Sequence, residues 1–366
     1  MPVSYWRRMD FVLLGLTLAL IVVGFFVIGQ AQPTEVRSLV LHQVVAVCLG
    51  LVVLVVLLIL SYERLMVASR WIWAGGVLLL GVVLLFPPIN GARGWIPLPF
   101  FSIQPIELMK PILAIALGAV FGRLGPAGVT RVGDLWRPIV VYAVPTLLVA
   151  LQPDMGGVLV LTVEFLAALF VAGMPFRYWA VLLIGGAAVL GFFFTVGLQY
   201  LPDYQVQRIN AFLGGSGANL YQTQRGQAAI EAGGLFGTGI STSHPALYLT
   251  IPEVQTDFIF AVVGESFGFI GACLLLLAYL GVLRRISSIG QRSTDPAAQV
   301  LVSAVFGVFL IHIVENIGMA VGILPVTGIP LPFLSYGGSA TLGFLTSLGL
   351  VESVAVRKQG LDFLET

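Results

Sequence analysis

Three short motifs place an acidic residue at the start of an apolar run. They are Gln104-Pro105-Ile106-Glu107, Gln152-Pro153-Asp154 and Gln255-Thr256-Asp257. A carboxylate held at such a position can act as a general base. The same residue types are also ordinary at helix starts, because proline fits the first turn and an acid there interacts with the positive end of the helix dipole. The sequence leaves both interpretations open for each acid.

Two cations lie close in sequence to the first motif, Arg93 and Lys110. Helix N-termini that converge, with cations beside them, form a binding site for an anionic headgroup such as a pyrophosphate. The functional interpretation is therefore an anion site with a carboxylate base next to it.

Four acids fall within long apolar runs, Glu107, Glu164, Glu265 and Glu315, and Lys110 is the cation embedded with them. A charge at the centre of a bilayer costs about 2.5–3.5 kcal/mol, and one lysine cannot neutralise four acids. Glu107 and Lys110 are three residues apart, so they share one helix face. They predict either an internal ion pair or a hydrated cavity that opens outward.

Composition indicates the elements that must position these residues. Of 366 residues, 58% are hydrophobic and 10% are charged, whereas soluble proteins carry about 25% charged residues. A net charge of +1 is too small for a protein that binds nucleic acid. The two cysteines lie in apolar runs, which excludes a disulfide scaffold. The three histidines lack metal-ligand spacing, so no metal site is predicted.

The sequence predicts an all-α integral membrane protein with about ten transmembrane helices, in a single polytopic domain over residues 1–366. The expected spans are Phe11–Ile28, Leu39–Leu60, Trp71–Phe86, Pro105–Phe121, Ile139–Leu151, Met155–Ala172, Tyr178–Leu198, Phe258–Leu283, Val300–Leu324 and Phe333–Val356. With the N-terminus inside, thirteen of the 18 Lys and Arg residues lie inside, four lie outside, and Lys110 lies within a span. The positive-inside rule then places both termini in the cytoplasm.

The connection between the seventh and eighth spans, Gln199–Thr256, is too long for an ordinary interhelical loop and lies on the outer face. It is expected to contain a short amphipathic helix at Tyr204–Leu213 and a second helix at Tyr221–Ala232. Asn219 is a candidate cap for the second helix, and Gly233-Gly234 would end it.

Several stretches, in order along most of the chain, carry a family resemblance. Besides the three entrance motifs they are Arg93-Gly94-Trp95, Asp203-Tyr204-Gln205 with Arg208-Ile209, Tyr221-Gln222, Gly233-Gly234-Leu235-Phe236-Gly237 and Pro330-Leu331-Pro332-Phe333-Leu334-Ser335-Tyr336-Gly337-Gly338-Ser339. Together they resemble the SEDS family (shape, elongation, division and sporulation), membrane enzymes that polymerise peptidoglycan. Residues 325–332 are similar to the branch that acts in cell elongation and shape.

The resemblance implies an inverting glycosyltransferase that polymerises lipid II into β-1,4 glycan strands and releases undecaprenyl pyrophosphate. It implies Asp257 as the catalytic base and a set of substrate-binding residues. That set is Arg93, Trp95, Gln104, Glu107, Lys110, Gln152, Asp154, Arg208, Ser335 and Tyr336. Within it, Arg93, Lys110 and Arg208 are the candidates for contact with the pyrophosphate.

The resemblance also implies a bacterial cytoplasmic (inner) membrane location, a class B penicillin-binding protein as the transpeptidase partner, and other elongation-machinery proteins. No nucleic acid partner and no resident cofactor are expected, and a divalent cation is left open. Two other functions remain open. A lipid II flippase would also need embedded acids in a hydrated cavity. A scaffold would use the same transmembrane helices only to recruit other enzymes.

Overall fold

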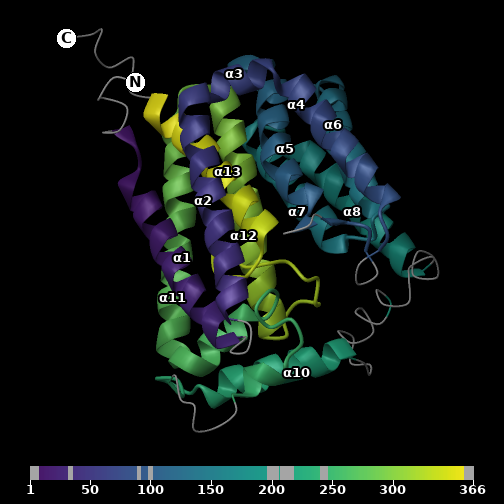
Figure 1. Cartoon of the computed structure of the whole chain (residues 1–366). Helices are drawn as coiled ribbons and strands as arrows, with labels where there is room; N and C mark the ends of the chain where they lie inside the picture. The colour runs from purple at the N-terminus through teal and green to yellow at the C-terminus, as the bar shows by residue number, and fades with distance from the viewer. Residues whose placement is uncertain are drawn as a thin grey trace.

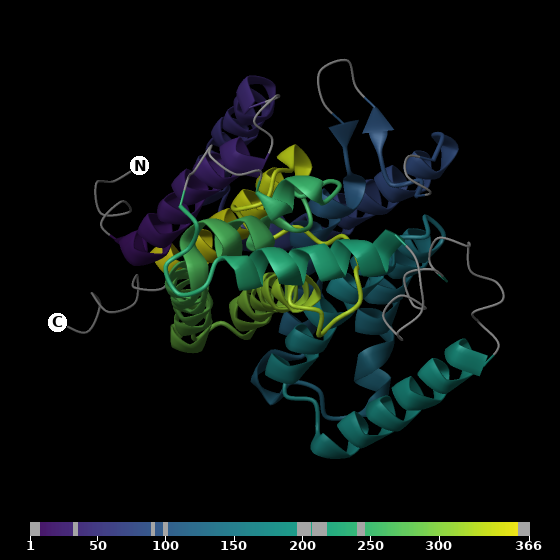
Figure 2. The same ribbon diagram turned by 90° about the horizontal axis from the view of Figure 1, so that it is seen from below.

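The computed structural model describes residues 8–31, 36–88, 92–97, 102–195, 206, 218–239 and 246–357. Within these residues the protein is a bundle of helices that stand side by side, with α10 (Ala218–Ala232) lying across one end (Figure 1). Seen from that end, α10 crosses the face of the bundle (Figure 2). The all-α membrane fold is the one that the sequence predicts.

The elements follow in chain order. They are α1 (Phe11–Ala31), α2 (Val36–Leu60), α3 (Tyr62–Val67), α4 (Ser69–Val82), β1 (Ile96–Pro97), β2 (Ser102–Ile103), α5 (Pro105–Gly122), α6 (Trp136–Ala150), α7 (Met155–Val171), α8 (Phe176–Thr195), α10, α11 (Ile259–Arg292), α12 (Pro296–Ala320) and α13 (Gly338–Arg357). Short 3-10 turns occur at Val83–Leu85, Gly125–Ala127, Val132–Leu135 and Leu247–Thr250. Strands β1 and β2 form an antiparallel hairpin just before α5.

In the described part of the chain, seven helices are long and apolar enough to cross a membrane. They are Phe11–Ala31, Val36–Leu60, Pro105–Gly122, Val132–Ala150, Ile259–Arg292, Pro296–Ala320 and Gly338–Arg357. Three shorter apolar helices, Ser69–Leu85, Met155–Val171 and Phe176–Gly186, correspond to the remaining predicted spans. Each of the ten apolar runs is therefore helical over most of its length.

Two predicted spans differ most from the helices at one end. The last helix begins at Gly338 rather than Phe333, because Pro330 and Pro332 cannot donate backbone hydrogen bonds and Phe333 has a positive φ of 64°. Helix α11 continues to Arg292, beyond the predicted end at Leu283. Hydropathy marks the apolar part of a helix and not the end of its backbone hydrogen bonding.

Helix α11 is interrupted at Gly268, whose φ of 65° and ψ of −165° are not helical. The loop after α10 bonds to the interruption: Phe269 N donates to Gly234 O at 2.9 Å, and Ile270 N donates to Leu235 O at 3.2 Å. An interruption inside an apolar helix is tolerated where protein satisfies the freed backbone groups. The loop residues 233–239 therefore belong to the packed bundle.

Glu265, one of the four embedded acids, lies at this interruption. Its carboxylate accepts hydrogen bonds from Leu247 N and Tyr248 N, both at 2.9 Å, and its backbone carbonyl accepts one from Thr238 N at 2.9 Å. The acid holds the outer loop onto α11.

The segments predicted to be cytoplasmic meet at the end of the bundle opposite α10 (Figure 1). Asp10, just before α1, forms an ion pair with Arg285 on α11, and its backbone N–H donates to Glu352 of α13 at 3.0 Å. Tyr62 Oη donates to Asp295 Oδ2 at 3.1 Å. These contacts agree with the predicted topology, in which the chain enters and leaves on one side.

The outer connection is described in part. The helix predicted at Tyr221–Ala232 is α10, which begins at Ala218, so Asn219 lies inside the helix instead of capping it. Helix α10 ends at Ala232, just before Gly233, as predicted. The helix predicted at 204–213 falls outside the described residues, apart from Val206.

Candidate functional site

The entrances of α7 and α11 contact the segment between α12 and α13, residues 325–337, which we call the proline loop, and the α5 entrance contacts the start of α13 just after it. At the α7 entrance, a Cβ on Gly156 would lie 3.0 Å from Ile329 Cγ1 and 3.3 Å from Thr327 O, so the loop packs against this glycine. At the α11 entrance, Tyr336 N donates to Gln255 O at 2.8 Å. Residues from distant parts of the sequence are thus brought to one end of the bundle.

The entrances of α5 and α7 also contact each other. A Cβ on Gly157 would clash with the Ile106 side chain, so only glycine permits this approach. Asp154 caps α7 by accepting a hydrogen bond from Gly157 N at 2.8 Å. The ordinary helix-start interpretation is therefore confirmed for Asp154, whose role in substrate binding stays a prediction.

The Arg93 segment is attached to the same entrances. Arg93 N donates to Gln152 O at 3.2 Å, and Gln152 is buried with its Nε2 donating to Leu80 O at 3.1 Å. Gln104 N donates to Ser339 Oγ at 3.1 Å. The Arg93 side chain is exposed, so it is free to meet an anion from outside.

Asp257 lies in the turn immediately before α11 and is half-buried. Its backbone carbonyl accepts a hydrogen bond of 2.7 Å from Asn316 Nδ2 on α12, and the same amide group donates to Ile329 O at 2.8 Å. A Cβ on Gly328 would lie 3.3 Å from Asp257 Oδ2. The carboxyl group therefore lies directly beside the proline loop.

Asn316 is a residue that the sequence prediction missed. It is fully buried and ties the backbone of Asp257 to that of the proline loop. The sequence does contain an indication of this role. Asn316 is an amide inside the apolar run Val300–Leu324, and such a group is costly to bury unless it is hydrogen-bonded.

Glu107 and Lys110 form the internal ion pair that the sequence predicts as one alternative. Lys110 Nζ lies 2.6 Å from Glu107 Oε2, and both side chains are about 5% exposed or less. Lys110 Nζ also lies 3.1 Å from His312 Nε2. His312 Nδ1 lies 2.9 Å from Pro330 O, and a carbonyl only accepts, so Nδ1 carries the proton and Nε2 accepts from the ammonium group.

This chain of contacts connects α5 through α12 to the proline loop. His312 was assigned no role from the sequence, because no metal-ligand spacing involves it. Its packing edge-on against Phe344, with ring centroids 4.8 Å apart, fixes the imidazole in this position.

Glu164 lies on α7 and is fully buried. Within the described residues neither of its carboxylate oxygens has a hydrogen-bond partner. An embedded acid without such a partner agrees with the charge count of the sequence, in which one lysine cannot neutralise four acids.

Ser335 and Tyr336 shape the proline loop. Ser335 Oγ accepts from Leu331 N at 2.9 Å, and Gln43 Nε2 of α2 donates to Ser335 O at 3.3 Å. Gln43, buried in an apolar helix, is a second residue that the sequence prediction missed. Ser335 is itself buried, so its hydroxyl holds the loop conformation.

Two substrate-binding candidates remain, Trp95 and Arg208. Trp95 is half-buried next to the β1–β2 hairpin. Arg208 lies outside the described residues. The arrangement offers a fixed, half-buried carboxylate and an exposed arginine at one end of the bundle, with a buried cation behind them. Such a set can remove a proton from a hydroxyl while stabilising an anionic group nearby.

Comparison with known proteins places these observations in context. Residues 6–360 match the family model described as cell cycle protein, of the FtsW, RodA and SpoVE type. A probable peptidoglycan glycosyltransferase FtsW of Coxiella burnetii is 33% identical over 301 residues, or 78% of each chain. The peptidoglycan glycosyltransferase MrdB of Escherichia coli K12 is 30% identical over 371 residues, covering 98% of this chain and 97% of MrdB.

Two solved structures of similar proteins agree with these sequence matches. A chain from a peptidoglycan synthase complex that coordinates polymerization and crosslinking is 32% identical, with a TM-score of 0.82 over 96% of this chain and 99% of that chain. The rod shape determining protein RodA of Thermus thermophilus is 32% identical, with a TM-score of 0.72 over 96% of this chain and 98% of RodA.

Proposed function

Because the chain belongs to the FtsW, RodA and SpoVE family and is a multi-pass bacterial membrane protein, we propose that it is a peptidoglycan glycosyltransferase. It polymerises lipid II into β-1,4 glycan strands in the cytoplasmic membrane. The match to nearly the whole length of MrdB and to a rod shape determining protein supports a role in cell elongation and shape.

In this proposal Asp257 is the general base. It takes the proton from the acceptor sugar hydroxyl, and the hydroxyl oxygen forms a bond to the anomeric carbon of the donor. The bond between that carbon and the pyrophosphate oxygen breaks, and undecaprenyl pyrophosphate leaves with the electron pair. Attack from the face opposite the leaving group converts an α-linked pyrophosphate into a β-linked glycoside.

The pyrophosphate needs positive charge while it leaves. Arg93 is exposed and can contact it directly. Lys110 is buried between Glu107 and His312, so its charge would act from behind the proline loop. Arg208 is a further candidate. The proposal includes no resident cofactor, and any divalent cation would enter with the pyrophosphate.

The observation that carries the proposal is the placement of Asp257. Its backbone is fixed by Asn316 and its carboxyl lies beside Gly328, in the proline loop that the α7 and α11 entrances contact. A flippase needs access to the headgroup from both leaflets, and nothing in this arrangement at one end of the bundle provides it.

The test is polymerisation of lipid II by purified protein in detergent, where flipping has no meaning, read as glycan strands on a gel. Asp257→Asn keeps the size of the side chain and removes the base. We expect a loss of roughly 10²–10⁴-fold, the usual contribution of a general base. Asp134→Asn, at an exposed turn of the opposite end, is the matched control and should polymerise normally.

Retained polymerisation by folded Asp257→Asn protein would remove this residue from the mechanism. Each reaction is run with and without a class B penicillin-binding protein, the transpeptidase partner that we propose for this chain. Inactive wild-type protein in both arms would favour the flippase or the scaffold.

For that partner we propose the lipid-facing apolar surface of α11 and α12. Phe269, Leu274, Leu277 and Leu280 are more than half exposed along α11, as expected of a surface that meets lipid or another helix. Photo-crosslinkers at these positions should capture the transpeptidase. Failure to capture it from any of them would exclude this surface.

A further inference from the structure

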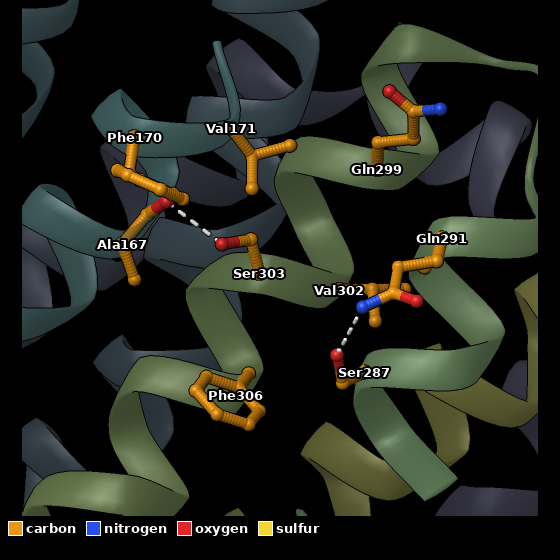
Figure 3. Close-up of a pocket in the computed structure, with 10 residues that line it drawn as sticks. Ala167, Phe170, Val171, Ser287, Gln291, Gln299, Val302, Ser303 and Phe306 are labelled. Atoms are coloured by element: carbon orange, nitrogen blue, oxygen red, sulfur yellow. Dashed lines mark hydrogen bonds between the residues drawn. The ribbon is translucent and has the colours of Figure 1, made fainter. Parts of the chain in front are cut away.

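A pocket of about 510 Å³ lies at the inner ends of α7, α11 and α12, at the end of the bundle opposite the candidate site (Figure 3). It is lined by Ala167, Phe170, Val171, Ser287, Gly290, Gln291, Gln299, Val302, Ser303 and Phe306. Its size falls within the range of ligand pockets, about 300–1,000 Å³. Nothing in the proposed reaction uses it.

The polar side chains of the pocket are engaged with the protein. Ser303 Oγ donates to Ala167 O at 2.7 Å, and Gln291 Nε2 donates to Ser287 Oγ at 3.0 Å (Figure 3). Gln299 Nε2 donates to a backbone carbonyl at 2.6 Å. Since each of these side chains already donates a hydrogen bond to the protein, the surface offered to an occupant is mostly apolar, and Phe170 at its edge is 73% exposed.

The α11 side of the pocket carries positive charge. Arg284 lies three residues before Ser287 and seven before Gln291, which places it on the same helix face, and Arg292 follows Gln291 directly. Both arginines are exposed. Neither forms an ion pair within the described residues, whereas the adjacent Arg285 is paired with an aspartate.

The acid that begins α12 does not neutralise these arginines. Asp295 accepts hydrogen bonds from Tyr62 Oη at 3.1 Å and from Ala297 N at 3.0 Å. The result is an apolar pocket beside two guanidinium groups that form no ion pair within the described residues. They are about 12 Å apart along α11 at 1.5 Å per residue, with Arg292 at the cytoplasmic end of the helix.

We propose that this pocket binds an anionic phospholipid of the inner leaflet, with an acyl chain in the groove over α12, between α7 and α11, and its phosphate within reach of Arg284 and Arg292. The lining of α12 runs from Gln299 to Phe306, about 10 Å at 1.5 Å per residue, which is most of the depth of one leaflet of a 30 Å core. Basic pockets between helices on the cytoplasmic side suit anionic headgroups, and guanidinium pairs well with phosphate. This site does not depend on the glycosyltransferase activity.

The test uses the full-length protein in phosphatidylcholine vesicles with trace spin-labelled phosphatidylglycerol or spin-labelled phosphatidylcholine. The fraction of immobilised label is measured by electron paramagnetic resonance. We expect the apparent affinity for phosphatidylglycerol to exceed that for phosphatidylcholine by roughly thirtyfold, since each arginine near a membrane surface contributes about 1 kcal/mol. Arg284→Gln with Arg292→Gln should abolish the preference, while Arg70→Gln, an exposed arginine on α4, should retain it.

Ala167→Leu, which fills the pocket, should lower the immobilised phosphatidylglycerol while leaving both arginines in place. The arginine variant lies on the surface and keeps the test valid if the filled pocket does not fold. Equal immobilisation of the two lipids would overturn the proposal. So would a preference that survives loss of both arginines, or a pocket covered by a second copy of the chain, detected as a cross-linked dimer through Phe170→Cys.

Discussion

Removal of the Asn316 amide should separate the geometry of catalysis from the stability of the fold. Asn316→Ala deletes the two hydrogen bonds that fix the carbonyls of Asp257 and Ile329, at 2.7 and 2.8 Å. Both bonds form where Asn316 is fully buried, so the two carbonyls lose these bonds without gaining water in exchange.

The magnitude follows from these two bonds. Each hydrogen bond contributes about 0.5–1.5 kcal/mol net, so Asn316→Ala should lower the free energy of unfolding by about 1–3 kcal/mol. The effect on rate is separate, because the backbone that carries the Asp257 carboxyl is no longer fixed to α12. A displacement of about 1 Å in a catalytic group can cost roughly 10²-fold in rate.

The assay measures thermal unfolding and the initial rate of lipid II polymerisation on the same preparations. The matched control is Ser353→Ala at the opposite end of the bundle. Ser353 is also fully buried, and its Oγ accepts two hydrogen bonds, from Tyr62 N at 3.1 Å and from Arg357 Nη1 at 2.7 Å. Ser353→Ala should destabilise the protein by a similar amount and leave the rate per folded molecule unchanged.

The reasoning is refuted if the two variants lose equal amounts of activity, because the loss would then reflect stability alone. It is equally refuted if Asn316→Ala polymerises lipid II at the wild-type rate. Lost activity with unchanged unfolding would show that Asn316 acts on the site without contributing to the fold.

Gly328→Ala and Gly173→Ala both place a side chain at a positive φ, of 82° and 74°, at a cost of about 1–2 kcal/mol each. Only the first puts a methyl group 3.3 Å from the Asp257 carboxylate, whereas the second meets no atom within 4 Å, so only Gly328→Ala should slow polymerisation; equal rates would contradict this. Glu107→Gln or Lys110→Gln alone leaves a buried charge unpaired and should cost about 3–5 kcal/mol in chemical unfolding, with the double variant recovering part of that loss; additive losses would argue against a coupled pair. Hydrogen bonds from two backbone N–H groups of its own turn lower the pKa of Asp134, so this carboxyl stabilises the turn above its unfolded pKa and stops doing so as pH falls through its folded pKa. Hydrogen exchange in that turn should therefore accelerate on acidification in the wild type, and Asp134→Asn should remove this pH dependence.

The membrane architecture could be predicted from the sequence because lipid imposes a local requirement. Every residue of a span must be apolar enough for the hydrocarbon core, and its backbone must bond within its own helix. Ten apolar runs therefore became ten helices, and the arginines at their ends indicated which way each helix points. Even here, the interruption of α11 at Gly268 was missed, because the hydrogen bonds there are made to a loop 35 residues earlier along the chain.

The acids of the three entrance motifs were equally visible, since residue type and helix start are both local features. Their different roles were not visible. Asp154 caps its own helix, Glu107 pairs with Lys110, and Asp257 is fixed by a residue on another helix. From residue types alone, all three are simply acids at the start of an apolar helix.

Tertiary structure decided which polar groups meet. Asn316 lies 59 residues from Asp257, Lys110 lies 202 residues from His312, and Asp10 lies 342 residues from Glu352. A buried polar group in a span is costly without a partner because no water is available, so the sequence indicates that most of these groups have partners. Their identity depended on how the helices pack around the proline loop.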